Sequence, residues 1–195
     1  MMKIIGVSGS PHKTGNNSRL IDRSLAIARD RGFDVDKIAL ADTEIAPCTD
    51  CGICRREKSC KFDDGMTGIY EKLESADGIL ISSPVYFGTL SGQLKCLLDR
   101  SVLLRRNGFL LKDKVGAALA VGGSRNGGQE YTIWSIHAWM HIHGMIVVGD
   151  NSHFGGIAVK DVDSDEEGLK TVDDTANKLC DTLLRLNQSN AKSIY

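Results

Sequence analysis

The stretch KIIGVSGSPHKTGNNS, from Lys3 to Ser18, decides the fold, because a short apolar run leads directly into a polar turn that contains glycine. The run from Lys3 to Val7 is typical of a parallel strand that is covered on both faces. A helix is expected to follow the turn, and Gly32 is a natural stop for it. A strand, a polar turn and a helix in this order predict the first βα unit of a layered α/β fold.

The same alternation continues along the chain. Further strands are expected at residues 34–40, 78–82, 115–121 and 145–148, and further helices at about 63–75, 91–102, 129–143 and 166–186, with a frayed end. Five strands alternating with five helices predict a doubly wound parallel sheet in the order 2-1-3-4-5, with helices on both faces. We find no linker or repeat. Residues 1–195 are therefore expected to form a single domain, with a cysteine-rich loop at 41–62 inserted after the second strand.

Composition and charge exclude several classes of protein. The chain has 195 residues, of which 42% are apolar, and a formal net charge of −1, so no global field attracts nucleic acid or an acidic membrane. No apolar run reaches the roughly 18 residues that a membrane span needs, and the start MMKIIGVSGS is too short for a signal peptide. We expect a cytoplasmic protein whose six cysteines stay reduced.

The turn after the first strand is a candidate phosphate site. In this architecture ligands bind beyond the carboxyl ends of the strands, at the switch point between strands 1 and 3. The turn lacks the closing GKS or GKT of a Walker A loop and the spacing of a GxGxxG turn, so a terminal phosphomonoester fits it better than a pyrophosphate. The candidate ligands are Ser8, Ser10, Asn16, Asn17 and Ser18.

Two further loops at the same edge suit a flat heterocycle, which needs a face to lie on and amides to bond its edge. They contribute Pro84, Val85, Tyr86, Phe87 and Gly88 after strand 3, and Gly122, Gly123, Ser124 and Arg125 after strand 4. A cation at Arg125 would stabilise the anionic reduced form of a flavin. Each loop alone is equally well explained as a turn, but three such loops at one edge favour a flavin site.

The stretch PCTDCGICRREKSCKF, from Pro47 to Phe62, places Cys48, Cys51, Cys54 and Cys60 in a Cys-x2-Cys-x2-Cys-x5-Cys pattern. Ferredoxins present three cysteines of a cluster with the same Cys-x2-Cys-x2-Cys spacing, so an iron–sulfur cluster is favoured. Structural zinc also accepts four cysteines, although zinc sites usually separate two Cys-x2-Cys pairs widely. Cysteines without a metal are the third alternative.

The charges around these cysteines are mostly positive. Arg55, Arg56, Lys58 and Lys61 would stabilise a reduced cluster and attract an acidic electron carrier, or they simply keep a solvated loop soluble. Because the loop leaves the carboxyl end of strand 2, we expect the thiols at the same sheet edge as the flavin loops.

Several other side chains have simpler interpretations. We expect helix packing for Cys96 and Cys180, salt bridges or subunit contacts for the arginines near residue 100, and core or subunit contacts for the histidines and tryptophans of the helix before residue 143. His153 and Phe154 follow strand 5 and are candidates to lie beside a flavin. The arginines are Arg100, Arg105 and Arg106. The histidines and tryptophans are Trp134, His137, Trp139, His141 and His143.

The motifs GSPHKTGNNS, SSPVYFGTLSGQLK and the GGQE of GGSRNGGQE resemble the signatures of the flavodoxin-like NAD(P)H-dependent FMN reductase superfamily. With the compact cysteine motif, and with the stretches DRSVLLRRNGFLLKDKVGAALAVGGSRNGGQE and HIHGMIVVGDNSHFGG, the chain resembles the iron–sulfur flavoproteins of anaerobic microbes over roughly residues 3–156. One departure is His12, where the superfamily usually has arginine. Lys13 or backbone amides are expected to take over that phosphate contact.

The resemblance implies FMN, a [4Fe-4S] cluster and a homotetramer, a dimer of dimers that brings flavin and cluster together across subunits. The implied function is electron transfer from a low-potential donor such as ferredoxin, through the cluster to FMN, and on to a small acceptor such as O2, H2O2 or a quinone. One alternative is an NAD(P)H-dependent FMN or quinone reductase. The other is a redox sensor that is not an enzyme, in which the state of the cluster alters assembly or partner binding.

Overall fold

The computed structural model describes the backbone of residues 1–192 and the side chains of residues 1–189. Its strands are β1 (Lys3–Ser8), β2 (Asp34–Ala39), β3 (Gly78–Pro84), β4 (Val115–Gly122), β5 (Ile146–Val148) and β6 (Gly156–Val159). Its α-helices are α1 (Asn16–Asp30), α2 (Met66–Ser75), α3 (Gly92–Arg100), α4 (Val102–Arg106), α5 (Gln129–Ile142) and α6 (Glu166–Lys192). The backbone is still helical at residues 187–192, where fraying was expected, and residues 193–195 lie outside the described part.

The sheet has the predicted order β2-β1-β3-β4-β5, and the pairs along it are parallel. It differs from the prediction by a sixth strand, since β6 pairs with β4 next to β5 on the same edge. Val115 of β4 stands opposite Ile146 of β5, and Leu119 stands opposite Gly156 of β6. The strand predicted at residues 145–148 is therefore present as β5. After a loop at residues 149–155, β6 continues the same edge of the sheet.

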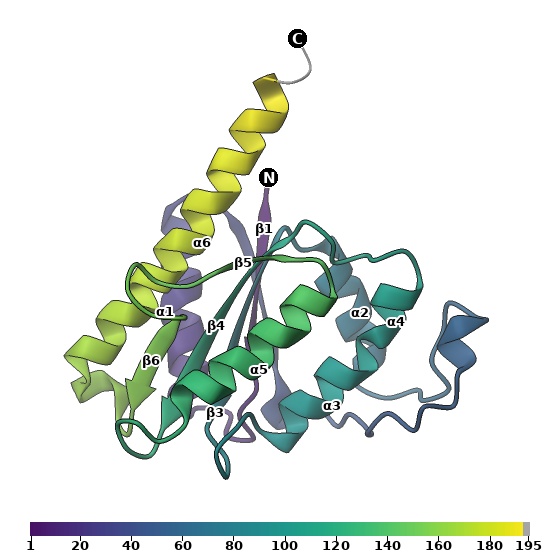
Figure 1. Ribbon diagram of the computed structural model, residues 1–195, viewed down its shortest axis with the longest axis horizontal. Coiled ribbons are helices and arrows are strands. Elements are labelled where there is room, and N and C mark those ends of the chain that lie inside the picture. The colour runs from purple at the N-terminus through teal and green to yellow at the C-terminus, as the bar shows by residue number, and fades with distance from the viewer. Residues whose placement is uncertain (193–195) are drawn as a thin grey trace.

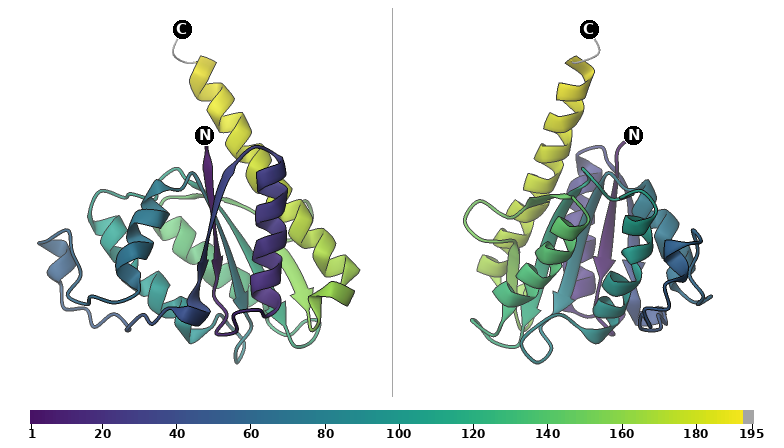
Figure 2. Two further views of the ribbon diagram at one scale, coloured as in Figure 1. Left: turned by 180° about the vertical axis from the view of Figure 1, so that it is seen from behind. Right: turned by 45° about the vertical axis from the view of Figure 1, so that its right-hand side comes forward.

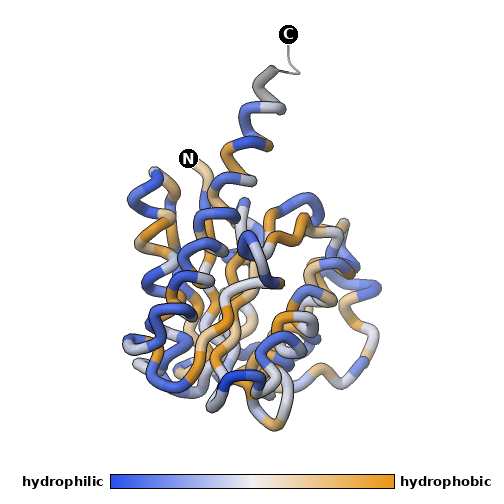
Figure 3. Tube along the Cα trace, turned by 60° about the vertical axis from the view of Figure 1, so that its left-hand side comes forward, coloured by the Kyte–Doolittle hydropathy of each residue, from blue (hydrophilic) through white to orange (hydrophobic). Residues whose placement is uncertain are grey.

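Helices cover both faces of the sheet, and each face has its own hydrophobic core (Figure 1). Ile5 and Ile81 face a core with α2, α3 and α5, whereas Ile4 and Leu80 face a core with α1 and α6. Every residue of β3 and β4 is buried, which explains why these strands read as continuous apolar runs. Figure 2 shows α1 and α6 together on one side, and Figure 3 shows the apolar strands between more polar helices.

The predicted helix at residues 91–102 is broken at Ser101, so that prediction was wrong in its extent. The Ser101 hydroxyl donates to Leu98 O at 2.7 Å and accepts the indole N–H of Trp139 at 2.7 Å. His143 Nε2 lies 3.0 Å from the same hydroxyl. Because this network is buried, α3 and α4 bend around a polar contact to α5 that the apolar pattern does not reveal.

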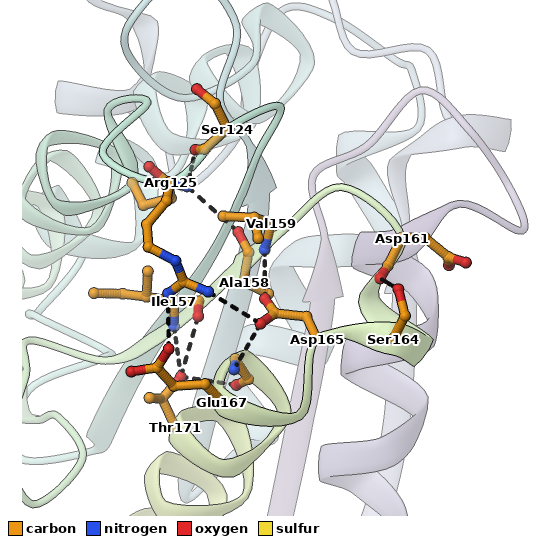
Figure 4. Close-up of polar contacts among 12 residues, drawn as sticks. Ser124, Arg125, Ile157, Ala158, Val159, Asp161, Ser164, Asp165, Glu167 and Thr171 are labelled. Carbon is orange, nitrogen blue, oxygen red and sulfur yellow. Dashed lines mark hydrogen bonds and ion pairs between the residues drawn. The ribbon is translucent and has the colours of Figure 1, made fainter.

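The side chain of Asp165 links β6 to the start of α6 through hydrogen bonds (Figure 4). One carboxylate oxygen accepts the Gly168 N–H in the first turn of α6 at 3.1 Å, and the other accepts the Val159 N–H of β6 at 2.8 Å. Thr171, one turn later, accepts the Ile157 N–H at 2.9 Å. These side chains satisfy backbone groups that the short strand and the helix terminus leave open.

Replacing Asp165 by alanine should lower the free energy of unfolding by about 2–3 kcal/mol, because a helix cap is lost and the Val159 N–H loses its acceptor. Asp163→Ala is the matched control, since it removes only an exposed ion pair with Arg19 and should cost less than about 1 kcal/mol. Urea unfolding of both variants measures the difference. Equal costs would contradict the role given to Asp165.

Among the described residues, no helix combines the length and the apolar character needed to cross a membrane.

Candidate functional site

The turn between β1 and α1 has the open backbone groups of an anion site. The N-cap of α1 is Gly15, which has no side chain to accept the N–H groups of the first turn, and no acidic residue lies in that turn. The helix dipole and these N–H groups favour a negative charge at this point. The side chains of Ser8, Ser10, Asn17 and Ser18 are buried around the turn.

The turn is held to β3 and α3 by hydrogen bonds. The Gly9 N–H donates to Ser82 O at 2.7 Å, and the Ser91 hydroxyl donates to Gly9 O at 2.5 Å. The buried Ser82 hydroxyl donates to the side-chain oxygen of Asn17 at 2.7 Å. A methyl group at Gly9 would lie 3.0 Å from both Ser82 O and the Leu94 side chain, so glycine permits this close approach.

Several predicted phosphate ligands already have partners within the chain. Asn16 donates to Lys160 O, the Ser10 hydroxyl accepts the His12 N–H at 3.1 Å, and Ser18 binds the Lys37 ammonium at 2.7 Å. Lys13, expected to replace the usual arginine, pairs with Asp42 at 2.8 Å. The backbone N–H groups of the turn are therefore the strongest candidate hydrogen-bond donors to an anion. The side-chain ligands remain predictions.

A carboxylate at the N-cap of α1 should compete with a bound phosphate. Gly15→Asp should suit the helix, since aspartate is a favoured N-cap, yet it places a negative charge where the phosphate would bind. We expect FMN affinity to fall by about tenfold or more, because like charges a few ångströms apart repel by several kcal/mol near a protein surface. Titration of the apoprotein with FMN, followed by flavin fluorescence, measures the affinity.

Gly15→Ala is the control, because any Cβ at Gly15 lies 3.0 Å from the His12 side chain. It shares the steric change without the charge. Equal losses of affinity in the two variants would argue against an anion at this helix terminus.

The loop after β3 exposes an aromatic side chain at the same edge. Tyr86 N–H donates to Thr89 O at 2.8 Å, and the two central residues, Phe87 and Gly88, have φ of 50° and 93°. Positive φ at both positions is typical of a tight hairpin turn. The turn leaves the Phe87 side chain fully exposed, at 110% of the reference area. This loop thus exposes an aromatic side chain, and its contact with a flavin stays a prediction.

The loop after β4 packs against the β3 loop, since a Cβ at Gly128 would lie 3.2 Å from Gly88 O. Gln129 holds this loop from inside: its carbonyl accepts the Gly127 N–H at 2.8 Å, and its amide donates to Ser124 O at 2.7 Å. Gln129 is fully buried and was missed as a site residue. The GGQE motif already contained it, and it was used there only for the resemblance.

Arg125 lies on the side of this loop that faces α6. Its guanidinium is 3.4 Å from Asp165 and 3.2 Å from Glu167 (Figure 4). Two carboxylates therefore already share its positive charge. Its expected contact with a flavin stays a prediction.

The four clustered cysteines line one pocket together. The thiols of Cys48, Cys51, Cys54 and Cys60 are free and at least partly exposed. The same pocket is lined by Phe62, Tyr70, Leu103 and two arginines, Arg100 and Arg106. No three His, Cys, Asp or Glu side chains within residues 1–189 converge closely enough to hold a single metal ion.

Two arginines position the cysteine loop. Arg106 donates to Cys54 Sγ at 3.0 Å, and this hydrogen bond raises the pKa of the arginine. Arg100 is only 2% exposed and binds Asp64 through two nitrogens, at 2.9 and 3.1 Å. It also donates to Ala46 O at 2.9 Å, and Asp64 accepts the Ala46 N–H at 2.9 Å. The two ends of the loop are thereby closed on each other.

The structure places Cys54 beside α4, and Cys48 lines a pocket that also includes Leu90 and Lys95 near the start of α3, so the expected position of the cysteines at the flavin edge stays a prediction. Cys54 bonds to Arg106 in α4, whereas the flavin edge is marked by Ser91, which precedes α3 and bonds to Gly9. In Figure 1 the blue segment around residues 50–58 lies beside α4 at the right. The loop leaves the carboxyl end of β2, and contacts such as that between Cys54 and Arg106 then hold it beside α4.

The remaining predicted side chains are mostly structural. Trp139 and His143 are buried, and burial lowers the pKa of His143 to about 4. Cys180 is buried as expected, but Cys96 is only half-buried, because it lies at the edge of the apolar face of α3. Phe154 packs edge-on against exposed Trp134, with ring centroids 5.1 Å apart.

His153 lies beside Asp150 rather than free at the edge. Its Nδ1 is 2.8 Å from the Asp150 carboxylate, which also accepts the Ser152 N–H at 2.8 Å. Burial alone would raise the pKa of Asp150, but these hydrogen bonds hold it below its ordinary value. A contact of His153 or Phe154 with a flavin stays a prediction.

Comparison with known proteins identifies the family. The family model described as "NADPH-dependent FMN reductase" matches residues 2–158. The iron-sulfur flavoprotein of Methanosarcina thermophila is 56% identical over 191 residues, which cover 98% of this chain and 100% of the relative. The chain belongs to the iron–sulfur flavoproteins of this FMN reductase family. An iron-sulfur flavoprotein of Methanocaldococcus jannaschii is 46% identical over 93% of this chain and 97% of its own length.

Solved structures of other proteins have a fold similar to that of this chain. A flavodoxin, WrbA-like protein from Agrobacterium tumefaciens superposes with a TM-score of 0.71 at 17% identity, covering 95% of this chain and 99% of its own. An NADH:FMN oxidoreductase superposes with a TM-score of 0.65 at 22% identity, covering 97% and 90%. The flavodoxin-like fold is thus confirmed. As a member of the FMN reductase family the protein is a flavin-dependent oxidoreductase, and the family supports FMN as its cofactor.

Proposed function

We propose that the protein transfers electrons from a low-potential donor, such as ferredoxin, through a [4Fe-4S] cluster held by the cysteine loop to FMN, and on to a small acceptor such as O2, H2O2 or a quinone. The cofactors supply one-electron and two-electron redox chemistry when bound, while the chain binds, orients and shields them. In this proposal residues 1–195 act as one FMN-binding unit and residues 41–62 are its cluster-binding insertion.

The observation that carries the proposal is the pocket shared by Cys48, Cys51, Cys54 and Cys60. Each thiolate of a [4Fe-4S] cluster binds a different iron atom, so the ligands are spread more widely than around one zinc ion. Four thiols that line one pocket can supply the four ligands of such a cluster. The Arg106 hydrogen bond to Cys54 also suits a ligand that is an anionic thiolate.

The surface of the cysteine loop supports an acidic electron donor. Arg55, Arg56, Lys58 and Lys61 are all exposed around the cysteines. Exposed charge of one sign steers an oppositely charged partner and orients its approach. A small acidic carrier such as ferredoxin has the complementary charge.

The distance between the cysteines and the flavin edge supports an assembly of several chains. Cys54 contacts α4 beyond one end of α3, and Ser91 contacts the phosphate turn beyond the other end, so an electron route within one chain would run along α3. We therefore propose a homotetramer, a dimer of dimers, in which the cysteine loop of one subunit lies near the flavin edge of another. The free cysteines suit a reducing cytoplasm.

The proposal is tested by purifying the protein without oxygen and measuring iron, acid-labile sulfide, zinc and FMN, with a visible spectrum. We expect four iron and four sulfide per chain beside one FMN. Stoichiometric zinc without sulfide would contradict the cluster.

The two alternatives give different results with defined reductants. Rapid reduction of FMN by NADPH, with no response to reduced ferredoxin, would favour an NAD(P)H-dependent FMN or quinone reductase. An oligomeric state that changes on oxidation, without turnover of any acceptor, would favour a redox sensor.

A further inference from the structure

We propose that Arg100 donates its Nε–H to the cluster, or to a thiolate that holds it, and thereby raises the reduction potential of the cluster. The inference rests on the proposed function and assigns to this chain a residue that tunes the cluster without being a ligand. The role is distinct from the closing of the loop by the same side chain, since the two use different nitrogens.

Both terminal nitrogens of Arg100 donate within the chain, through three of their four N–H groups. Nη1 donates to Ala46 O and to Asp64 Oδ2, both at 2.9 Å, and Nη2 donates to Asp64 Oδ1 at 3.1 Å. These three bonds fix the plane of the guanidinium group. Held in this way, the Nε–H does not reach water.

The Nε–H group is buried and has no partner among the described residues. Arg100 as a whole is 2% exposed, and its guanidinium carbon lies 4.9 Å from the centre of the Phe62 ring. A buried charged donor without an acceptor is more costly than a neutral one. An acceptor with negative charge in this pocket would satisfy the Nε–H group.

The place of the side chain identifies the acceptor by its chemistry. Arg100 lines the pocket of the four cysteines, together with Phe62 and Tyr70. The acceptors that a cluster would bring into this pocket are sulfur atoms carrying negative charge, either thiolates or inorganic sulfide. Burial alone would lower the pKa of Arg100, but Asp64 and Tyr70 hold it above its ordinary value, so the donor stays charged.

Hydrogen bonds to the sulfur atoms and nearby charges affect the reduction potential of a cluster. Reduction adds one negative charge to the cluster, so a buried cation that donates to sulfur stabilises the reduced form more than the oxidised form. Arg106 makes a comparable bond to Cys54, but through Nη1. The two arginines can therefore be told apart by which nitrogen couples to the cluster.

The first experiment is a redox titration of the anaerobic protein, followed by electron paramagnetic resonance of the cluster and absorbance of FMN. Arg100→Lys keeps the charge and can still bind Asp64, but it has no Nε–H. We expect its cluster to be about tenfold harder to reduce, a shift of about −59 mV for one electron, with the FMN potential unchanged. Arg105→Lys is the matched control, because Arg105 lies outside this pocket and bonds to Ile142 O.

The second experiment uses the wild-type sequence, so it does not depend on whether a variant folds. Arginine labelled with 15N at Nε alone is incorporated, and pulsed electron paramagnetic resonance is recorded on the reduced cluster. A 15N coupling that persists in Arg106→Lys supports the inference. The absence of any 15N coupling in the wild type overturns it.

The outcomes separate this inference from the function on which it rests. A cluster whose potential is the same in Arg100→Lys and the wild type overturns the role of Arg100 while leaving the electron-transfer function intact. A wild-type protein that contains FMN but neither iron nor sulfide overturns the proposed function, and the inference with it.

Discussion

Replacing Cys54 by serine is expected to remove the iron and acid-labile sulfide of the protein, or to convert its cluster, while FMN stays bound. Cys54 shares a pocket with the other three thiols of the loop and accepts a hydrogen bond from Arg106 at 3.0 Å. Serine is a poor ligand for iron and leaves the cluster with three thiolates. The phosphate turn and the β3 loop lie beyond the other end of α3, so the FMN content of the variant should be unchanged.

Cys96→Ser is the matched control for this prediction, because Cys96 is also a free, half-buried thiol but does not line the cysteine pocket. Its iron, sulfide and FMN contents should equal those of the wild type. Iron and sulfide are measured chemically and FMN by its absorbance after release. A parallel loss of iron and FMN from Cys54→Ser would show that the two cofactors share one site.

Replacing Asp64 by alanine should have the largest effect on stability, lowering the free energy of unfolding by about 3–5 kcal/mol. The side chains of Arg100 and Asp64 are 2% and 17% exposed, so the variant leaves a buried cation without its counter-ion. The Ala46 N–H also loses its acceptor, and the ends of the cysteine loop are released from each other. Urea unfolding measures the stability, and iron content measures whether the released loop still holds metal.

A double variant separates the ion pair from the rest of this effect. Arg100→Met in the Asp64→Ala background removes the uncompensated charge, and it should recover part of the lost stability. If Asp64→Ala costs less than about 1 kcal/mol, or if the second change destabilises the protein further, the buried pair does not hold the loop.

The contribution of Asp64 should also depend on pH. Burial alone would raise the pKa of Asp64, but its bonds to Arg100 and to the N–H groups of Ala46 and Met66 hold it below the ordinary value. A carboxylate whose folded pKa is depressed stabilises the protein above its unfolded pKa, near 3.9, and loses that contribution as the pH falls through the folded pKa. The stability difference between the wild type and Asp64→Ala should therefore shrink below about pH 4.

The sequence was sufficient for the sheet, because β1, β3 and β4 are buried on both faces and their apolar runs are continuous. It was not sufficient for β6. The four residues of β6 follow a loop of Gly, Asn, Ser and His, and they are extended because β4 offers them free hydrogen-bonding groups. The break at Ser101 was missed for a similar reason, since its partners Trp139 and His143 are about 40 residues away.

The candidate site, like the fold, could be predicted from the sequence only in part. The loops at the carboxyl ends of β1, β3 and β4 could be predicted, because parallel strands bring their ends to one edge. The position of the cysteines could not, since it depends on Arg100 and Arg106 reaching across from other elements. Both arginines were interpreted as salt bridges or subunit contacts, and nothing in their local sequence marks them as neighbours of Cys54.

The central claim is that electrons reach FMN through the cysteine loop. It is tested most directly by mixing reduced ferredoxin with the FMN-loaded wild type and with FMN-loaded Cys54→Ser, and by following flavin absorbance in a stopped-flow instrument without oxygen. The account predicts that the wild-type flavin is bleached and that the rate in the variant is at least about a hundredfold lower, because the entry route is lost. Equal rates of flavin reduction in the two proteins would contradict it.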